Sequence, residues 1–451
     1  MIYLLLTWLL APLLWLRAAL RGTQRTNRIL VIQTAKIGDF VATTPVFRAL
    51  RNRLPDAEIV ALLHPVNVPL ARQLDSIDRI VTLPKHGFKG WAGKRWLLDQ
   101  LAEGYDGVLI LSPNLTNLLV PFWAGVPKRV SVLADRRQGS ARLAWPFLTH
   151  GEPHRAGQLF RETALRALAG FNINVDAAVF ALPNEIGSAE SGKALLDALA
   201  PQLHHPLVGL GLGAGNRMKA LDTAQIEMLA GQIVSRTSAT LILIGTEADR
   251  VAAEALCASL PPGRAVDTTG QWALDELPVL LGALDCFVGV DSGATYMADA
   301  LGVPVVDFMG PADDKDQRPI GRAAVVIRSA EPCAPCSHAF DAPYACHLGT
   351  RACIAKLPIP AVVEAVEAIL PNNIIYRKKQ GFAAPTNEWL RNQWYSYASE
   401  NILNSSFSKL GIINKDYMKS ILENHKSGKT NSGAMIYAML NLNLWYKQFW
   451  G

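Results

Sequence analysis

The sequence of 451 residues carries little charge: 18% of its residues are Asp, Glu, Lys or Arg, and the formal net charge is +6. A charge of this size favours an anionic partner, such as a phosphosugar or a lipid headgroup, without singling out nucleic acid. No segment combines aromatic and basic residues in the manner of an RNA-binding module. Half of the residues are hydrophobic, which excludes a disordered chain, and the length predicts two or three domains.

The chain also lacks an uninterrupted apolar run of the roughly 20 residues that a full membrane span needs. The run from Ile2 to Leu16 is shorter and is broken by Thr7. It has neither the basic leading region nor the small-residue cleavage site of a secretory signal. Four arginines follow between residues 17 and 28, which predicts that the rest of the chain stays in the cytoplasm. We expect residues 1–24 to form a hydrophobic membrane-anchor helix; a cleaved signal and a helix packed on the protein itself are the alternatives.

The glycines lack the spacing of a dinucleotide-binding loop. Counted from Gly209 or Gly211, the third glycine of that loop is missing, which argues against a nicotinamide-dependent dehydrogenase. The backbone N–H groups of Gly213 and Gly215 are nevertheless unencumbered, and Lys219 follows them. Such a loop suits a diphosphate, with a solvated basic loop as the alternative.

Short apolar runs alternate with helical patterns in two similar blocks, which is typical of parallel α/β sheets. In the first block the strand-like runs are 29–32, 59–63, 80–83, 108–111 and 130–133, and in the second they are 208–212, 241–245, 287–290, 303–308 and 325–327. We therefore predict two Rossmann-like domains, residues 28–185 and 203–370, whose parallel sheets face a cleft. Residues 372–451 show helical periodicity without strand alternation and are predicted to be a separate helical tail.

The most informative motif is Asp291-Ser292-Gly293, which lies where a buried strand pattern passes into a helical one. First-turn N–H groups and the helix dipole can bind an anion there, at the edge where open α/β sheets place ligands. An ordinary turn in which Asp291 caps the helix is the alternative.

A comparable motif opens the first block, where Gly38-Asp39 follows the strand-like run 29–32. Asp39 is expected at the cleft edge, as a general base that takes a proton from an attacking hydroxyl. The alternative is that Asp39 caps the following helix.

Other acidic residues give weaker signals. Glu247 follows the run 241–245, from where a carboxylate can accept hydrogen bonds from ribose hydroxyls, although it also suits the first turn of a helix. The segment Asp313-Asp314-Lys315-Asp316 is similar to the Asp-x-Asp signature of metal-dependent sugar transferases. We predict a mobile, solvated loop there and no metal.

Four of the six cysteines, Cys333, Cys336, Cys346 and Cys353, lie within 21 residues. The first pair has zinc-knuckle spacing, but the second pair is more widely spaced than in a standard finger. In a reducing cytoplasm disulfides are not expected. Free thiols are favoured, with structural zinc as the alternative and no cofactor predicted.

Taken together, these motifs resemble glycosyltransferase family 9, the ADP-heptose:lipopolysaccharide heptosyltransferases. The matching pieces are Lys36-Ile37-Gly38-Asp39, Lys219, Glu247, Gly289-Val290-Asp291-Ser292-Gly293 and Gly310-Pro311 with Gly321, so that the resemblance covers roughly residues 28–370. It implies a GT-B fold with the acceptor on the first domain and the nucleotide-sugar on the second. It also implies an inverting, metal-independent transfer of a sugar to a lipopolysaccharide core or related glycolipid at the cytoplasmic face of the inner membrane.

By motif position, the resemblance places the catalytic base on Asp39 and the donor contacts on Lys219, Glu247, Asp291, Ser292 and Gly293. Where the family usually has a histidine, this chain has Tyr296, which can donate one hydrogen bond to phosphate but is not cationic near neutral pH. Basic residues of the first domain could face the anionic acceptor: Lys36, Arg48, Arg136 and Arg137. Each alone is more often a solvated surface charge.

The tail resembles the carboxyl end of glutamine-hydrolysing asparagine synthases, through Lys378-Lys379-Gln380-Gly381-Phe382 and the following Trp389-Leu390-Arg391. The chain has no Ser-Gly-Gly-x-Asp-Ser ATP loop, and residue 2 is Ile2 rather than a nucleophilic cysteine. An amidotransferase or ligase cannot be assembled from this fragment, so we interpret the tail as an inherited or fused remnant. The competing functions are a degenerate nucleotide-sugar-binding protein and a protein that docks partners through the tail.

Overall fold

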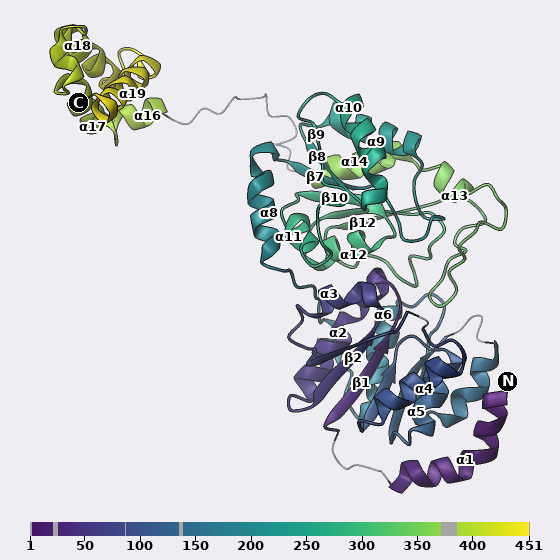
Figure 1. The fold of residues 1–451 in the computed structure, drawn as a ribbon. Helices are drawn as coiled ribbons and strands as arrows, with labels where there is room; N and C mark the ends of the chain where they lie inside the picture. Colours follow the sequence, from purple (N-terminus) through teal and green to yellow (C-terminus); the bar gives the residue numbers. More distant parts are fainter. Residues whose placement is uncertain (1, 21–25, 86, 135–138, 371–385, 451) are drawn as a thin grey trace. The chain divides into compact units, whose positions relative to one another are not determined.

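The structure is a computed structural model that describes residues 2–20, 26–85, 87–134, 139–370 and 386–450. The chain divides into two compact units, Met1–Tyr376 and Arg377–Gly451. The first unit holds two lobes, each built on one parallel sheet of six strands (Figure 1).

The first lobe contains the sheet β3-β2-β1-β4-β5-β6, in which all neighbouring strands are parallel. Its strands are β1 (Arg28–Gln33), β2 (Glu58–Leu63), β3 (Arg79–Thr82), β4 (Gly107–Ile110), β5 (Lys128–Leu133) and β6 (His150–Pro153). The helical segments around it are α2 (Ile37–Arg53), α3 (Val68–Ala71), α4 (Gly90–Leu101), α5 (Leu115–Trp123), η2 (Gly139–Phe147), α6 (Phe160–Arg166) and α7 (Ala177–Phe180). Alternate residues of β1 enter different hydrophobic clusters, Ile29 in one and Leu30 in the other, because helices cover both faces of the sheet.

The second lobe contains the sheet β12-β11-β10-β7-β8-β9. Its strands are β7 (Leu207–Gly211), β8 (Thr240–Ile244), β9 (Ala265–Asp267), β10 (Cys286–Val290), β11 (Val305–Met309) and β12 (Ala324–Arg328). Its helices are α8 (Ser191–Leu199), α9 (Thr223–Arg236), α10 (Arg250–Ser259), α11 (Leu277–Gly282), α12 (Gly293–Ala300), α13 (Ala352–Ala355) and α14 (Ile359–Ile369).

Both sheets have the strand order 3-2-1-4-5-6 when each lobe is numbered by itself. In each lobe the first three strands are added toward one edge of the sheet and the last three toward the other edge. The change of direction falls between the neighbouring strands β1 and β4 in the first lobe, and between β7 and β10 in the second. Ligands of open α/β sheets bind outside the carboxyl ends of strands at such a switch point. The predicted fold class, with two Rossmann-like lobes, is confirmed.

The sequence patterns missed the edge strands β6 and β9. The sequence of β6 is His-Gly-Glu-Pro, and β9 has only three residues, so neither contains an apolar run. An edge strand tolerates polar residues because it pairs with another strand on one side only.

The helix α1 (Ile2–Leu20) lies against the first lobe and contacts α5 (Figure 1). Within the described residues it is the one helix that is long and apolar enough to cross a membrane. The second unit is helical, as predicted for the tail. It packs α16 (Thr386–Arg391), α17 (Tyr395–Leu403), α18 (Lys415–Lys426) and α19 (Gly433–Phe449) around a small core that includes Leu390, Leu422 and Ile436.

Candidate functional site

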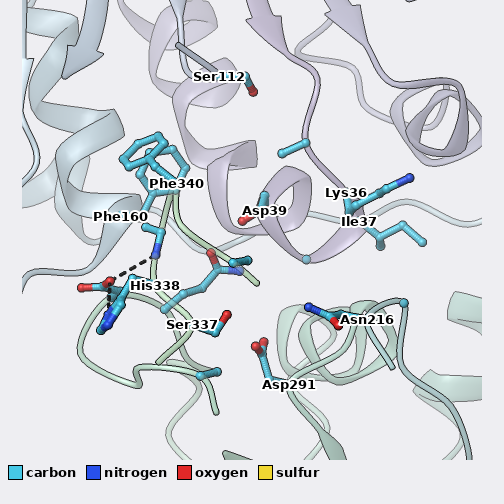
Figure 2. Close-up of a pocket in the computed structure, with 18 of the residues that line it drawn as sticks. Lys36, Ile37, Asp39, Ser112, Phe160, Asn216, Asp291, Ser337, His338 and Phe340 are labelled. Carbon is cyan, nitrogen blue, oxygen red and sulfur yellow. Dashed lines mark hydrogen bonds and ion pairs between the residues drawn. The ribbon is translucent and has the colours of Figure 1, made fainter. Parts of the chain in front are cut away.

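A cleft of about 920 Å³ lies where the carboxyl ends of the two sheets meet. The first lobe contributes the segment after β1 and the residues after β4. The second lobe contributes the loop after β7, the start of α12 and the two segments that flank β12 (Figure 2). Of the predicted site residues, the cleft is lined by Lys36, Asp39, Gly215, Lys219, Asp291, Ser292, Gly293 and Tyr296.

Two glycines allow α2 and α12 to approach each other across the cleft. A Cβ atom on Gly38 would lie 2.9 Å from a ring carbon of Tyr296, and one on Gly293 would lie 2.8 Å from Cβ of Ile37. Any larger residue at these positions would push the helices apart. The close approach is what brings Asp39 of one lobe opposite Asp291 of the other (Figure 2).

Asp39 is the third residue of α2, and the helix is capped by Lys36, so the alternative assignment of Asp39 as N-cap is wrong. The backbone around it is fixed by a polar network. The Gln33 amide donates to Thr43 Oγ1 at 2.9 Å, and Ser112 Oγ donates to Gln33 Oε1 at 2.6 Å. Because this network uses the backbone carbonyl of Asp39 and not its carboxylate, the side chain remains available to the cleft.

The pKa of Asp39 is raised from 3.8 to about 6. Burial is the largest cause, because it disfavours the charged form. Lys219 lowers the pKa, whereas the carboxylate of Asp291 raises it. An acid with a pKa close to neutral suits proton transfer, because it is largely ionised near pH 7 and still basic enough to accept a proton.

Opposite Asp39, the second lobe presents a lysine held by a carboxylate. The ammonium group of Lys219 forms an ion pair with Asp291, and the hydroxyl of Tyr296 donates to Asp291 Oδ1 at 2.9 Å. Burial lowers the pKa of Lys219, but the pairing with Asp291 outweighs this effect and the net shift is upward, so the lysine is cationic. Burial raises the pKa of Tyr296 well above its usual value, which keeps the phenol neutral.

The start of α12 offers backbone donors beside this lysine. Its N-cap is Ser292, so the alternative assignment of Asp291 as the cap is wrong. Thr295 Oγ1 donates to the carbonyl of Val290 at 2.6 Å and fixes the turn between β10 and α12. The N–H groups of the first turn of a helix and its dipole favour an anion, so Lys219 and α12 together form a site for a negatively charged group.

Other predicted residues lie elsewhere. Gly213 packs near Asp249 and does not line the cleft. Glu247 is exposed and pairs with Arg250 at 2.6 Å, while Arg48 pairs with Glu185 at 2.6 Å. Arg136 and Arg137 lie outside the described residues.

The segments 312–317 and 337–344, which flank β12, line one end of the cleft, and sequence patterns did not indicate this role. The backbone N–H of Phe160 in the first lobe donates to the carbonyl of Asp316 at 2.7 Å, and the rings of Phe160 and Phe340 meet edge-to-face at 5.1 Å. Two aromatic residues that are 180 positions apart in sequence carry no local signal of pairing.

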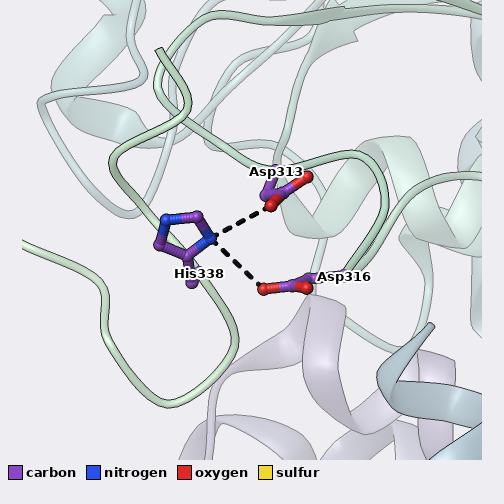
Figure 3. Close-up of side chains that lie close together, drawn as sticks. All are labelled: Asp313, Asp316 and His338. Carbon is purple, nitrogen blue, oxygen red and sulfur yellow. Dashed lines mark hydrogen bonds and ion pairs between the residues drawn. The ribbon is translucent and has the colours of Figure 1, made fainter. Parts of the chain in front are cut away.

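The predicted mobile, solvated loop at Asp313–Asp316 is contradicted for Asp314 and Asp316, which are both buried. Asp314 pairs with Arg328. His338 Nδ1 lies 3.1 Å from Asp313 and 3.4 Å from Asp316 (Figure 3). The ligand atoms of Asp313, Asp316 and His338 lie within 4.8 Å of one another, which is the one group in the described part of the chain that could hold a metal ion. Hydrogen bonds from His338 and from the N–H of Ala339 satisfy the same carboxylates.

None of the six cysteines forms a disulfide in the structure. Backbone N–H groups, that of Arg351 first, lower the pKa of the Cys346 thiol. Burial and the neighbouring thiols raise the pKa of Cys336 and of Cys353. Cys353 lies in α13, and the other three clustered cysteines lie in the segment before it. Their sulfur atoms do not form a tight ligand group like that of His338.

Both parts of the chain are similar to known proteins. The model of the glycosyltransferase family 9 (heptosyltransferase) matches residues 95–344, which is more than half of the chain. Lipopolysaccharide heptosyltransferase 2 of Salmonella typhimurium is 26% identical over 320 residues, covering 67% of this chain and 88% of that protein. The structure of the Escherichia coli ADP-heptose LPS heptosyltransferase II aligns with a TM-score of 0.57 at 21% identity, over 76% of this chain and 98% of that one, which shows a shared fold.

The carboxyl-terminal region has a separate similarity. The asparagine synthase family model matches residues 360–447. The glutamine-hydrolysing asparagine synthetase 1 of Bacillus subtilis is 32% identical over 83 residues, which cover 18% of this chain and only 13% of that protein. The predicted resemblance of the tail to asparagine synthases is confirmed, and it concerns a small part of that larger protein.

Proposed function

The chain belongs to glycosyltransferase family 9, and from this premise we propose that it transfers a heptose from ADP-heptose to a lipopolysaccharide core or related glycolipid. The donor is proposed because the similar E. coli structure is named an ADP-heptose enzyme, and the acceptor because the relatives are named lipopolysaccharide heptosyltransferases. Such an acceptor lies in a membrane, so the protein is proposed to act at the cytoplasmic face of the inner membrane.

One observation carries the proposal: a carboxylate with a raised pKa on one lobe faces a lysine and a helix N-terminus on the other. In the proposed reaction Asp39 takes the proton of the acceptor hydroxyl as its oxygen attacks the anomeric carbon. Lys219 and the N–H groups of α12 stabilise the diphosphate as the glycosidic C–O bond breaks. Base and leaving-group site lie on opposite lobes, which favours a single in-line displacement with inversion.

The proposed transfer needs no metal ion. Lys219 is cationic and lies where the diphosphate charge would grow, so the chain itself supplies the positive charge that a divalent ion provides in other transferases. Closure of the two lobes would exclude water from the cleft.

The test is a donor screen with the purified protein. Release of nucleoside diphosphate is measured with ADP-heptose, other ADP-sugars and UDP-sugars, each with and without a lipid A-core acceptor. The proposal expects acceptor-dependent release of ADP from ADP-heptose. Tight binding of ADP-heptose with no release under any condition would contradict transfer and identify a nucleotide-sugar-binding protein.

A further inference from the structure

The helix α1 is docked on the first lobe by one narrow stripe. Leu4, Thr7, Ala11 and Ala18 are buried. Thr7 Oγ1 accepts a hydrogen bond from the indole Nε1 of Trp123 at 2.7 Å, and Arg17 donates to the Trp123 carbonyl at 3.2 Å. Near the start of the helix Tyr3 stacks on Trp91, so that this contact and the one made by Arg17 hold α1 lengthwise along the lobe, next to α5 (Figure 1).

The opposite face of α1 is a stripe of exposed leucines. Leu5, Leu9 and Leu13 are 65%, 76% and 67% exposed, and Leu16 and Leu20 continue the stripe. At 3.6 residues per turn, this set lies on the far side of the helix from the buried stripe. Contiguous apolar surface of this kind marks a protein or membrane contact.

The lobe beside α1 extends the same apolar face. Trp91 at the start of α4 is 59% exposed and stacks on Tyr3 with ring centroids 5.0 Å apart. On the other flank, Leu143 of η2 is 51% exposed, and Phe147 packs on Trp8 at 4.8 Å. Tryptophan, with an apolar ring and one N–H, is enriched where a protein meets the headgroup region of a bilayer.

Between α1, α4 and α5 runs an aromatic groove of about 380 Å³. Its walls include Tyr3, Trp91, Leu119 and Trp123, and the cations Lys94 and Arg95 line it together with one acid, Asp99. The Lys94 ammonium lies 4.4 Å from the centre of the Tyr3 ring. An apolar groove with two cations at its side matches an acyl chain joined to an anionic headgroup.

We propose that α1, the start of α4 and η2 form one membrane-binding face, which lies in the plane of an anionic bilayer, and that the groove between α1, α4 and α5 takes an acyl chain of one of its lipids. A helix held lengthwise on a water-soluble lobe does not cross the bilayer. Its exposed leucines instead enter the interface together, as in helices that lie on membranes. This inference does not depend on which sugar is transferred.

The test uses the full-length protein and brominated vesicles of phosphatidylcholine, with or without phosphatidylglycerol. Sedimentation measures binding, and bromine on the acyl chains quenches nearby tryptophan. We expect binding that depends on phosphatidylglycerol, and quenching that falls clearly in Trp91→Phe but not in the control Trp445→Phe, whose tryptophan is exposed in the second unit. If α1 crossed the membrane and left the lobe in water, Trp91→Phe would leave the quenching unchanged, and the proposal would be overturned.

Two double variants, each with a control, distinguish the contribution of charge to membrane binding from that of apolar contact. Lys94→Glu with Arg95→Glu is expected to weaken binding to anionic vesicles by about tenfold or more, against the control Lys419→Glu. Leu9→Glu with Leu13→Glu is expected to weaken it similarly, against Val251→Glu, which alters an 80% exposed valine of α10. Equal binding of all variants would overturn the proposal, as would a lipid-independent dimer that buries α1. Release of ADP from soluble substrates is measured alongside, so that loss of membrane binding is distinguished from loss of transfer.

Discussion

The raised pKa of Asp39 is the property on which the proposed chemistry depends at the scale of single residues. Asp39 acts as a base only when ionised, so kcat/KM is expected to fall as the pH drops below about 6. Lys219 lowers this pKa, so removing its charge should move the acid limb to higher pH. We predict this shift for Lys219→Met but not for Lys219→Arg, measured in pH profiles of kcat/KM. An acid limb near pH 4, or one that Lys219→Met leaves in place, would assign the profile to another group.

A second prediction concerns Lys219 and Asp291, the side chains proposed to bind and stabilise the diphosphate. Lys219→Ala should lower kcat/KM by roughly 100-fold, since one such electrostatic donor typically contributes about 3 kcal/mol to barrier lowering. Asp291→Ala should also weaken donor binding or departure, because Asp291 positions the ammonium of Lys219. Calorimetry and steady-state kinetics measure both effects. Unchanged Kd and kcat/KM in both variants would place the donor site elsewhere.

Metal independence is tested by chelation. The cluster of Asp313, Asp316 and His338 is braced by hydrogen bonds, so we predict that EDTA leaves the transfer rate unchanged. Asp313→Asn serves as the matched variant and should have little effect on metal response. A strong loss with EDTA that Mn²⁺ or Mg²⁺ restores, and that disappears in Asp313→Asn, would assign a functional metal to the cluster.

At the scale of elements, α14 packs on the second lobe. Its main contacts in the described structure are with α9, β10, β11 and β12, and Val362, Val363 and Val366 are buried there. The sequence does not specify this partner, because an apolar stripe on a helix indicates burial without indicating the surface that covers it.

The tail and α14 are therefore expected to behave differently when removed. A protein that ends at Pro371 should keep its melting temperature and transfer rate, because the second unit has its own core and none of its described residues lines the cleft. A protein that ends at Leu357 loses the buried valines of α14 and should unfold several degrees lower, since each buried aliphatic side chain contributes about 1.5–3 kcal/mol. A folded but inactive protein ending at Pro371 would assign the tail a part in transfer.

For the molecule as a whole, some features can be predicted from the sequence and others arise only when distant parts of the chain meet on folding. The central strands were predicted because each is an apolar run, and the carboxyl-edge rule then placed Asp39 and Asp291 near the cleft. The meeting of the two lobes at Gly38 and Tyr296 was not predictable, because it joins residues that are far apart in the chain. For the same reason the segment Asp313–Asp316, at one end of the cleft, was taken for a solvated loop.

The most direct test of the account is the variant Asp39→Asn, which keeps the shape of the side chain and removes the base. A raised carboxyl pKa means that the ionised form opposes folding above pH 6, so the variant should melt no lower than the wild type at pH 7.5. Donor binding should stay within a few-fold, because the proposed diphosphate site, with Lys219 and the start of α12, belongs to the other lobe. The transfer rate should fall by about 10²–10⁴-fold. Retention of more than about a tenth of the wild-type rate would contradict Asp39 as the catalytic base.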